Sequence, residues 1–539
     1  MKKRVAATFL AAAMAAALAG CGGGAKQETA AAAPAEPVAS AEEFSYPMPA
    51  GEKVTFWGEL GNTESPNYAN RGEEPFAKEW MKRTGVDIEF LHPPAGQTKE
   101  QFSLILADGN LPDMLEYNWL MDYPGGPEKA IKDGVIIPLN DVFAQYCPNI
   151  TKYLEENPEI DKMIRTDDGN YYAFPFIRGD ERLCYTIGPM LRADWLEKVG
   201  LEIPTTIDEW HTVLTAFKEE MGATAPFCPE YTRLDLMEAD PFMAAYNIGK
   251  NFYVDDNGVV QYGGVQEGYR QYLETMHQWY SEGLIDRDLA TLKFDQVNAK
   301  MTNGSAGATI GFTGSYMGTW MNAATATNPD YLLVAAPFPT VEKGAFPEFG
   351  YMSGQYSGRA STAITTSCKD VERVARLLDY AYGEEGHMFF NFGIEGESYN
   401  MVDGEPVYSD WVMNNPDGWP VSQAMSAYIR GNTNGPFVQD YRYLMQYYAL
   451  DCQKNTPEVW NSNIRKHVLP PITPTSDESR EMSAIVNEIT TYRDEMALKY
   501  ILGNESLDTF DEYVQNIKNM GLDRALEIQN GALERYNAR

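Results

Sequence analysis

The fold of this chain is decided by three short apolar runs: VTFW at residues 54–57, VDIEF at residues 86–90 and DMLEY at residues 113–117. The two intervals between them carry helical patterns, over residues 74–83 and 97–107. Strands that alternate with helices of this length predict a parallel sheet with covering helices, because each parallel connection needs a crossover. We therefore expect an α/β fold whose first sheet begins with the run VTFW.

Aromatic and polar side chains follow the first and third runs. Ligands of parallel α/β sheets bind at the carboxyl ends of the strands. The chain holds 33 Tyr and 10 Trp, and such rings suit a sugar, whose C–H face stacks while its hydroxyls need hydrogen-bond partners. We expect a ring at this edge to stack on a sugar and a carboxylate to accept hydroxyl hydrogen bonds. The residues are Trp57, Glu59, Tyr117, Asn118 and Trp119; the alternative is that Trp57 and Trp119 pack under the loop.

The rest of the chain continues the mixed pattern of strands and helices. Asp167-Asp168-Gly169-Asn170 predicts a hairpin turn. Asp255-Asp256-Asn257-Gly258 lacks the ligand spacing and terminal Glu of a calcium loop, so a β-turn is the better interpretation. Helices are expected over residues 192–199, 207–220, 269–282, 371–382 and 478–502, followed by two amphipathic helices over residues 510–520 and 522–536.

The N-terminus has the composition of a secretory leader. Lys2, Lys3 and Arg4 precede an apolar stretch over residues 5–18, which is too short to span a membrane permanently. Leu18-Ala19-Gly20-Cys21 resembles the lipobox of bacterial lipoproteins, which implies removal of residues 1–20 and lipidation of Cys21. An ordinary secretion signal with a chance cysteine is the alternative. Residues 21–51 then comprise the lipidated Cys and a tether rich in Ala, Gly, Pro and Glu, which we expect to be disordered.

Charge and the scatter of reactive residues exclude several classes of function. The formal net charge is −34, which repels nucleic-acid phosphates and anionic lipid head groups. The five histidines lie far apart, and no HExxH or GxSxG motif occurs, so we assign no catalytic residue, metal site or cofactor. Five cysteines are expected to be mostly small buried side chains: Cys147, Cys184, Cys228, Cys368 and Cys452.

Segments spread along the chain resemble one family in content and in order. They are ADGNLPD at residues 107–113, DGNYYAFP at residues 168–175, RADWLEKVGL at residues 192–201, PTTIDEW at residues 204–210 and MTNGSAGA at residues 301–308. These segments resemble those of bacterial extracellular solute-binding proteins. GIEGESY at residues 393–399 and the C-terminal helices are similar to the large LplA-like lipoproteins of oligosaccharide ABC importers. The resemblance extends over nearly the whole body of the chain.

This resemblance implies a two-lobed, periplasmic-binding-protein-like α/β fold of type II, with a hinge and a helical C-terminal extension. The chain would cross between the lobes near residues 175–185, 336–339 and 395–399. Closure by hinge bending would enclose a ligand between the lobes. The implied first lobe comprises residues 52–178 and 340–395, and the implied second lobe comprises residues 179–339 and 396–539.

A second set of candidate ligand contacts follows from the resemblance. GFTGSY at residues 311–316 contains small residues, which let a ligand approach the backbone closely. The second wall and the hinge would supply Arg178, Tyr185, Ser315, Tyr316, Trp320, Tyr356 and Glu395. The charge of the ligand stays open, because Arg178, Arg182 and Arg359 lie where the cleft is expected and would suit a uronate.

The function implied is that of a monomeric, extracellular receptor held at the outer face of the cell membrane by its lipid alone. It would capture an oligosaccharide, or another polar solute, and deliver it to an ABC permease. Two alternatives stay open: a binding-only sensor lipoprotein, and a secreted glycoside hydrolase, which needs a pair of carboxylates at a set separation. No nucleic-acid partner is expected, and whether a structural calcium binds stays open.

Overall fold

The computed structural model describes residues 44–231, 241–356, 358, 361–430 and 434–539. The chain divides into two units, residues 1–45 and Tyr46–Arg539. The predictions for the leader, for Cys21 and for most of the tether fall outside the described residues, as does the one for Arg359. All elements below belong to the second unit.

Packed structure begins before the predicted end of the tether. The Tyr46 hydroxyl donates a hydrogen bond of 2.6 Å to the Arg376 carbonyl, and the Arg373 guanidinium donates to the Pro49 carbonyl. Because Tyr46 and Pro49 have partners in the folded core, we propose that the tether ends before Tyr46 rather than at residue 51.

The first sheet contains the parallel strands that the sequence predicts. Its strand order is β11-β3-β1-β2. β1 (Val54–Trp57) pairs in parallel with β2 (Ile88–Leu91) and with β3 (Met114–Tyr117), while β11 (Ser361–Ile364) adds antiparallel to β3. The α/β prediction is confirmed for this part of the chain. The crossover helices are α1 (Pro75–Thr84) and α2 (Thr98–Asp108), and α3 (Gly126–Lys132) follows β3.

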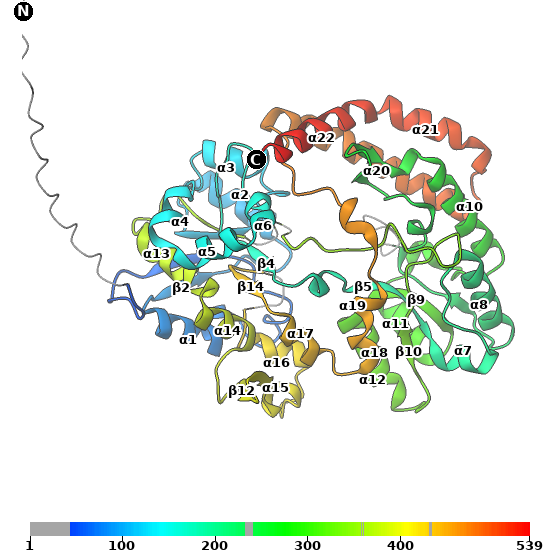
Figure 1. The fold of residues 1–539 in the computed structure, drawn as a ribbon, viewed down its shortest axis with the longest axis horizontal. Helices are drawn as coiled ribbons and strands as arrows, with labels where there is room; N and C mark the ends of the chain where they lie inside the picture. The colour runs from blue at the N-terminus through cyan, green and yellow to red at the C-terminus, as the bar shows by residue number, and fades with distance from the viewer. Residues whose placement is uncertain (1–43, 232–240, 357, 359–360, 431–433) are drawn as a thin grey trace, which may run out of the picture. The chain divides into compact units, whose positions relative to one another are not determined.

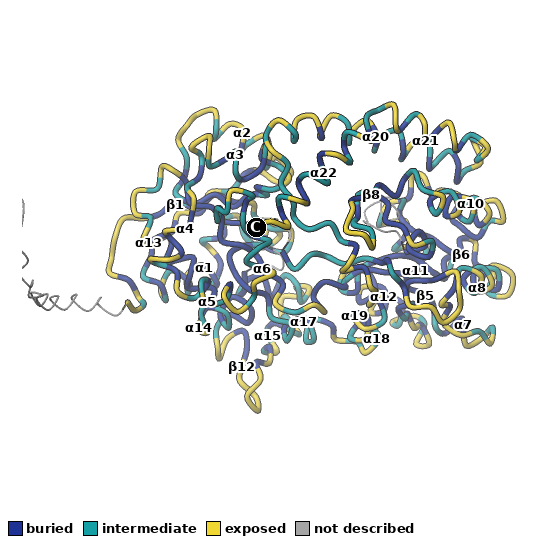
Figure 2. Tube along the Cα trace, turned by 45° about the horizontal axis from the view of Figure 1, so that its top comes forward, coloured by how far each residue is buried: buried dark blue, intermediate teal, exposed yellow. Residues whose placement is uncertain are grey.

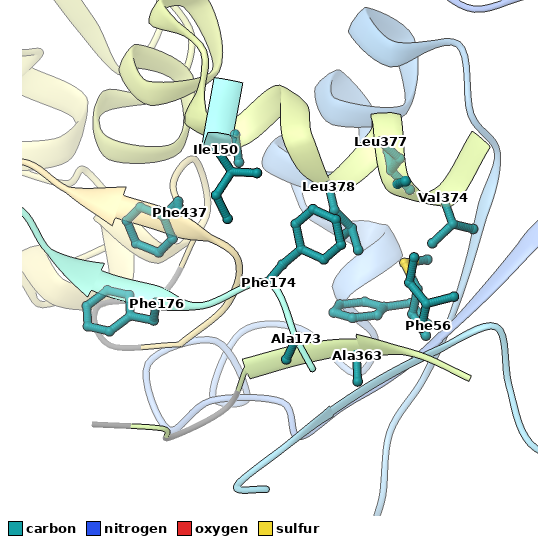
Figure 3. Close-up of a cluster of buried hydrophobic side chains, with 14 of the residues drawn as sticks. Phe56, Ile150, Ala173, Phe174, Phe176, Ala363, Val374, Leu377, Leu378 and Phe437 are labelled. Carbon is teal, nitrogen blue, oxygen red and sulfur yellow. The ribbon is translucent and has the colours of Figure 1, made fainter. Parts of the chain in front are cut away.

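A first hydrophobic core forms between this sheet and helices from distant parts of the sequence. Figure 3 shows Phe56, Ile150, Phe174, Leu378 and Phe437 gathered in one cluster. Burial of such side chains is the main favourable term in folding, so this cluster joins the first 180 residues to the segment that follows β11. The helices that contribute are α4 (Asn140–Tyr146), α5 (Pro148–Glu156), α6 (Pro158–Met163), α13 (Val371–Asp379) and α14 (Glu384–Phe392).

The second sheet has its own core and the strand order β10-β5-β9-β6. β5 (Ile187–Arg192) is buried along its whole length, as is nearly all of β9 (Ala306–Phe312), which is typical of strands covered on both faces. The other strands are β6 (Ala225–Phe227) and β10 (Leu333–Ala335). The helices are α7 (Ala193–Val199), α8 (Ile207–Glu219), α10 (Glu267–Ser281), α11 (Phe294–Asn303) and α12 (Thr319–Thr325), and the first three confirm the expected ones.

Among the residues that the structure describes, the chain passes between the two sheets in three places, which we call the crossing segments. The first joins β4 (Phe176–Arg178) to β5, and the second joins β10 to β11, where crossings were expected. The third runs from β14 (Phe437–Gln439) through α17 (Tyr441–Tyr447) to α18 (Asp451–Lys454), which contacts β10. β14 pairs in parallel with β4, and Figure 1 shows the two strands side by side.

The crossing predicted at residues 395–399 is wrong, because this segment belongs to a hairpin. β12 (Tyr399–Val402) pairs antiparallel with β13 (Glu405–Tyr408), and the outer part of this hairpin is exposed in Figure 2. Its tyrosines join a separate cluster with α16 (Val421–Ser426) and α17. We propose that the first lobe extends to Gln439 rather than to residue 395, since β14 pairs with β4.

Long helices form the C-terminal part of the fold and pack on the second core. α20 (Ser476–Leu502) starts with a capping box at Thr475, and α21 (Phe510–Asn519) and α22 (Leu522–Asn537) follow it, as predicted. Ile489, Tyr513 and Leu522 are buried against residues of α8 and α10. Figure 1 shows α20, α21 and α22 as one group. Within the described residues, no helix combines the length and apolar character needed to cross a membrane.

Candidate ligand-binding site

The three rings predicted for the first wall pack against one another. Tyr117 stacks on Phe102 with a centroid distance of 3.8 Å, and Trp57 lies 6.5 Å from Tyr117. Trp119 is fully buried, and its indole donates to the Ser361 carbonyl at 3.0 Å. Burial raises the pKa of Tyr117 to about 12. This geometry supports the alternative in which Trp57 and Trp119 pack under the loop.

The two polar residues of the first wall lie nearer the solvent. The Glu59 side chain is exposed, while its backbone carbonyl accepts a hydrogen bond of 2.8 Å from Arg71. Asn118 is half-buried and accepts from the backbone amide of Met121. Of the first wall, these two side chains are therefore the better placed to meet a ligand.

The predicted second wall centres on η6 (Thr313–Gly318), a π turn that leads into α12. Tyr316 is buried between Phe294 and Trp320, and its hydroxyl donates to Glu230 at 2.5 Å. Ser315 is exposed. The structure therefore brings Tyr316 and Trp320 together as packed, buried rings. Ser315, by contrast, is exposed to the solvent.

The glycines of this segment leave space that tyrosine rings occupy. A Cβ atom at Gly311 would lie 2.5 Å from the ring of Tyr316, and one at Gly314 would lie 2.6 Å from the ring of Tyr447. Both distances are shorter than a carbon–carbon contact allows. The sequence suggested close approach of a ligand; the structure shows close approach of side chains, and Gly314 thereby joins η6 to α17.

The candidates in the crossing segments are held by local partners. The Arg178 guanidinium donates to the Gly354 carbonyl at 2.7 Å, and the Tyr185 hydroxyl donates to Glu181 at 3.2 Å. Tyr356 is buried and its hydroxyl meets that of Tyr172. Glu395 is exposed beside the β12–β13 hairpin.

A small pocket lies where the loop after β1 meets α16 and α17. Its volume is about 30 Å³, room for about one water molecule, so any larger ligand would lie at its mouth. Tyr447 connects the pocket to η6 through its contact with Gly314. The lining residues are Thr63, Ser422, Met425, Ser426, Ile429, Tyr443 and Tyr447.

Four half-buried rings lie next to this pocket, and we call them the aromatic platform: Tyr68, Trp411, Trp419 and Tyr428. Trp419 is 6.3 Å from Tyr68 and 5.9 Å from Trp411, which in turn is 5.2 Å from Tyr428, all in edge-to-face geometry. The loop that carries Tyr68 also carries Thr63 of the pocket, whose carbonyl accepts from Ser426 at 2.8 Å. The platform and the pocket thus share one supporting loop.

Buried charges fix the loop that carries Thr63 and Tyr68 to the first sheet. The Arg71 guanidinium donates a hydrogen bond of 3.0 Å to the Glu64 carboxylate. The Arg430 guanidinium lies 3.5 Å from the same carboxylate. Burial opposes ionisation of Glu64, but the two arginines outweigh it, and its pKa is lowered. The Glu74 side chain is fully buried, and its carboxyl oxygens have no hydrogen-bond partner among the described residues; burial, followed by the charge of Glu64, raises its pKa to about 9. Glu74 is therefore neutral at pH 7.

Sequence reasoning missed both the pocket and the platform. The signals were present: YRYLMQYY at residues 441–448 is rich in tyrosine, and Trp419 stands in the polar turn NNPDGWP at residues 414–420. An aromatic side chain in a polar turn is a candidate for ligand contact. The buried charges gave no such signal, because their spacing in the sequence carries no periodicity.

The fold and the site define a solute-binding protein with two α/β cores. The profile of the family described as bacterial extracellular solute-binding protein matches residues 66–388, and the chain belongs to this family. The predicted family and the two-lobed periplasmic-binding-protein-like fold are confirmed. The five cysteines in the described part of the chain form no disulfide with one another, and Cys147, Cys184 and Cys228 are buried, as expected.

Similar proteins are described as an ABC transporter substrate-binding protein, a lipoprotein and an alginate-binding protein. FusA of Streptococcus pneumoniae, described as a fructooligosaccharide ABC transporter substrate-binding protein, is 26% identical over 487 residues, covering 85% of this chain and 86% of FusA. Lipoprotein LipO of Bacillus subtilis is 25% identical over 376 residues, covering 68% of this chain and 70% of LipO. The crystal structure of the alginate-binding protein AlgQ2 has a TM-score of 0.70 and 25% identity, covering 90% of this chain and 99% of AlgQ2. None of these three is described as an enzyme, in agreement with the non-catalytic prediction.

Proposed function

We propose that this protein is the receptor of an ABC importer and that it binds an oligosaccharide at the aromatic platform and the mouth of the adjoining pocket. The observation that carries the proposal is the platform itself, four partly exposed rings whose supporting loop also carries Thr63 of the pocket. Ring faces stack on the C–H faces of sugars, and the hydroxyls of Ser422 and Tyr447 supply hydrogen-bond partners. FusA, which resembles this chain over most of its length and is described as a fructooligosaccharide transporter's binding protein, supports an oligosaccharide as the ligand.

Binding in this site needs no chemistry on the ligand. The described histidines have structural partners: His387 lies 3.1 Å from Asp440 and His211 lies 2.6 Å from Glu282. The pocket is lined by hydroxyl and apolar side chains, without a carboxylate pair, and glycoside hydrolysis requires such a pair. Capture and release of an intact saccharide is the activity that these side chains support.

The cations around the platform argue for a neutral saccharide. Arg71 and Arg430 are bound by buried glutamates, and Arg182 is paired with Asp180 at 2.7 Å. A uronate at the platform would therefore have to compete for cations that already have partners, at a cost of several kcal/mol for a buried pair. Arg178, which donates to a carbonyl, is the described cation that an acidic sugar would use.

We also propose that the protein acts at the outer face of the cell membrane. Cleavage before Cys21 and lipidation of its thiol would hold the protein at the outer face of the membrane, where a second acyl chain makes attachment stable. LipO, a relative described as a lipoprotein, supports this arrangement. The protein would act as a monomer, attached to the membrane by its lipid alone, and pass its ligand to the permease subunits.

Isothermal titration calorimetry of the mature body tests the proposal. Nystose represents a neutral oligosaccharide and an alginate trimer represents an acidic one, with a wider glycan array to extend the range. We expect binding of one molecule of a neutral saccharide per chain, with the ligand recovered intact by chromatography. Absence of binding across the array contradicts the proposal, and shorter products after repeated turnover establish a hydrolase. Uptake of the labelled saccharide by cells lacking the protein separates transport from sensing.

A further inference from the structure

The carboxylate of Asp167 binds two arginines from the C-terminal segment. Asp167 lies in the hairpin turn that precedes β4. Its Oδ2 accepts a hydrogen bond of 2.9 Å from Arg535 Nε, and its Oδ1 accepts bonds of 2.6 and 3.1 Å from Arg539 Nη2 and Nε. Both arginines come from the end of the α22 segment. The Asp167 carboxylate is thus bound by two guanidinium groups.

Further contacts fix the two arginines in place. Arg535 Nη2 donates to Glu478 at 2.7 Å, in the first turn of α20. Arg539 Nη1 donates to the Arg165 carbonyl at 2.5 Å, and its Nη2 donates to the Thr473 hydroxyl at 2.9 Å. The Arg539 side chain is only 2% exposed and that of Asp167 is 16% exposed. Solvent and salt therefore screen this contact much less than a surface ion pair.

The contact joins the two cores outside the crossing segments, between the turn that precedes β4 and the C-terminal end of the α22 segment. The hairpin belongs to the first core, where Tyr172 and Phe174 are buried. α20 and α22 belong to the second core, where Ile489 and Leu522 are buried. The aromatic ring of Tyr536 adds to the same junction, because Lys162 Nζ lies 4.8 Å from its centroid. The two cores are therefore connected both by covalent crossings and by this ionic contact.

We propose that Asp167, Arg535 and Arg539 form a latch that holds the two lobes in the arrangement of this structure. A hinge motion that separates the hairpin from α22 must break the three hydrogen bonds to Asp167 and expose a desolvated arginine. Hinge motions occur about a few residues of the crossing segments, and an ionic contact outside those segments adds an energetic step to them. The latch thus makes lobe separation a transition between two discrete states.

Distance measurements between spin labels test the latch on the full mature chain. Labels at Lys152→Cys on α5 and Glu197→Cys on α7 report on the two cores, since both positions are exposed. We expect Asp167→Asn to broaden or shift the distance distribution in the absence of any ligand. Arg535→Gln, at a half-buried position that tolerates substitution more easily, is expected to shift it in the same direction.

The matched control is Arg524→Gln on the same helix. Arg524 pairs with Glu481 of α20 at 2.9 Å, so it loses an arginine–glutamate contact within the C-terminal helices and none to the hairpin. Its distance distribution should match that of the wild type. Distributions of Asp167→Asn and Arg535→Gln that also match the wild type overturn the latch. Because this readout needs no saccharide, its failure leaves the proposed function standing, and a failure of saccharide binding leaves the latch standing.

Discussion

Arg430 donates two hydrogen bonds, of 2.6 and 2.7 Å, to the carboxylate of Glu116, and both side chains are buried. Glu116 lies on β3 and Arg430 follows α16, so the pair joins the first sheet to the helix that lines the pocket. A buried ion pair often adds little net stability, because desolvation offsets attraction, yet loss of one partner leaves an unpaired buried charge. The pair therefore fixes the position of α16 relative to the sheet.

Substitution Arg430→Gln should destabilise the fold strongly. It leaves Glu116 buried without its cation, at a cost of about 3–5 kcal/mol. Urea unfolding followed by circular dichroism measures the change. Arg524→Gln, which breaks an exposed and solvent-screened pair, should leave the free energy of unfolding almost unchanged. Equal losses in the two variants would contradict a special role for Arg430.

Substitution Trp419→Ala should weaken saccharide binding by about 1–3 kcal/mol, the usual range for a truncated aromatic contact. Trp419 is half-buried and contacts both Tyr68 and Trp411, so its removal opens the centre of the platform. Calorimetry with the saccharide that binds the wild type measures the loss. Tyr280→Ala removes another half-buried ring, which lies on α10 of the second core, and should leave the affinity unchanged. Unchanged affinity in Trp419→Ala would remove the platform from the site.

The pH dependence of stability should change in Glu74→Gln. The folded-state pKa of Glu74 is raised from 4.5 to about 9, so the folded protein holds a proton that the unfolded chain releases above its ordinary pKa. Stability contributed by this proton is present below about pH 4.5 and is lost progressively as the pH rises to about 9. Glu74→Gln keeps the neutral form, so its free energy of unfolding should exceed that of the wild type increasingly between those limits. A constant difference across this range would contradict the raised pKa.

Substitution Cys21→Ser should abolish attachment to the membrane. The thiol is the group that would carry the acyl chains, and a tether without them has no apolar surface to insert. Fractionation of cells and labelling with a fatty-acid analogue measure the effect. We expect a soluble or uncleaved protein without label. A variant that still carries the label would show that the lipobox interpretation is wrong.

The sequence predicted the elements of this fold better than their connections. Alternation of apolar residues in VTFW and VDIEF located β1 and β2, and the pattern around Phe510 and Tyr513 located α21, because both signals are local. The third crossing was misplaced because its true position depends on the pairing of β14 with β4, whose residues lie far apart in the sequence. No local pattern reports such a pairing.

The candidate site illustrates the same limit. Trp57 and Trp119 stand at the carboxyl edge of the sheet, as predicted, but α2 brings Phe102 against this aromatic cluster. Trp411 and Tyr428, which no strand pattern marks, stay partly exposed in the packing of α15 (Asp410–Met413) and α16. Exposure of a ring is decided by tertiary packing, and a single sequence contains little information about it.

Substitution Gly314→Ala should disturb the junction between η6 and α17. The new Cβ would lie 2.6 and 3.1 Å from two carbons of the Tyr447 ring and 2.9 Å from its hydroxyl oxygen, so the ring must move away from the pocket that it lines. We expect lower saccharide affinity and a loss of stability of about 1–3 kcal/mol, as for overpacking in a core, measured by calorimetry and urea unfolding. Adding Tyr447→Leu should restore part of the stability but not the affinity, since the clash and the ligand contact depend on the same ring. Gly531→Ala in α22, where a Cβ meets only Arg535 at 3.6 Å, should instead stabilise the protein by about 0.5–1 kcal/mol. If the Gly314→Ala variant binds the saccharide and unfolds like the wild type, Tyr447 does not connect η6 to the pocket.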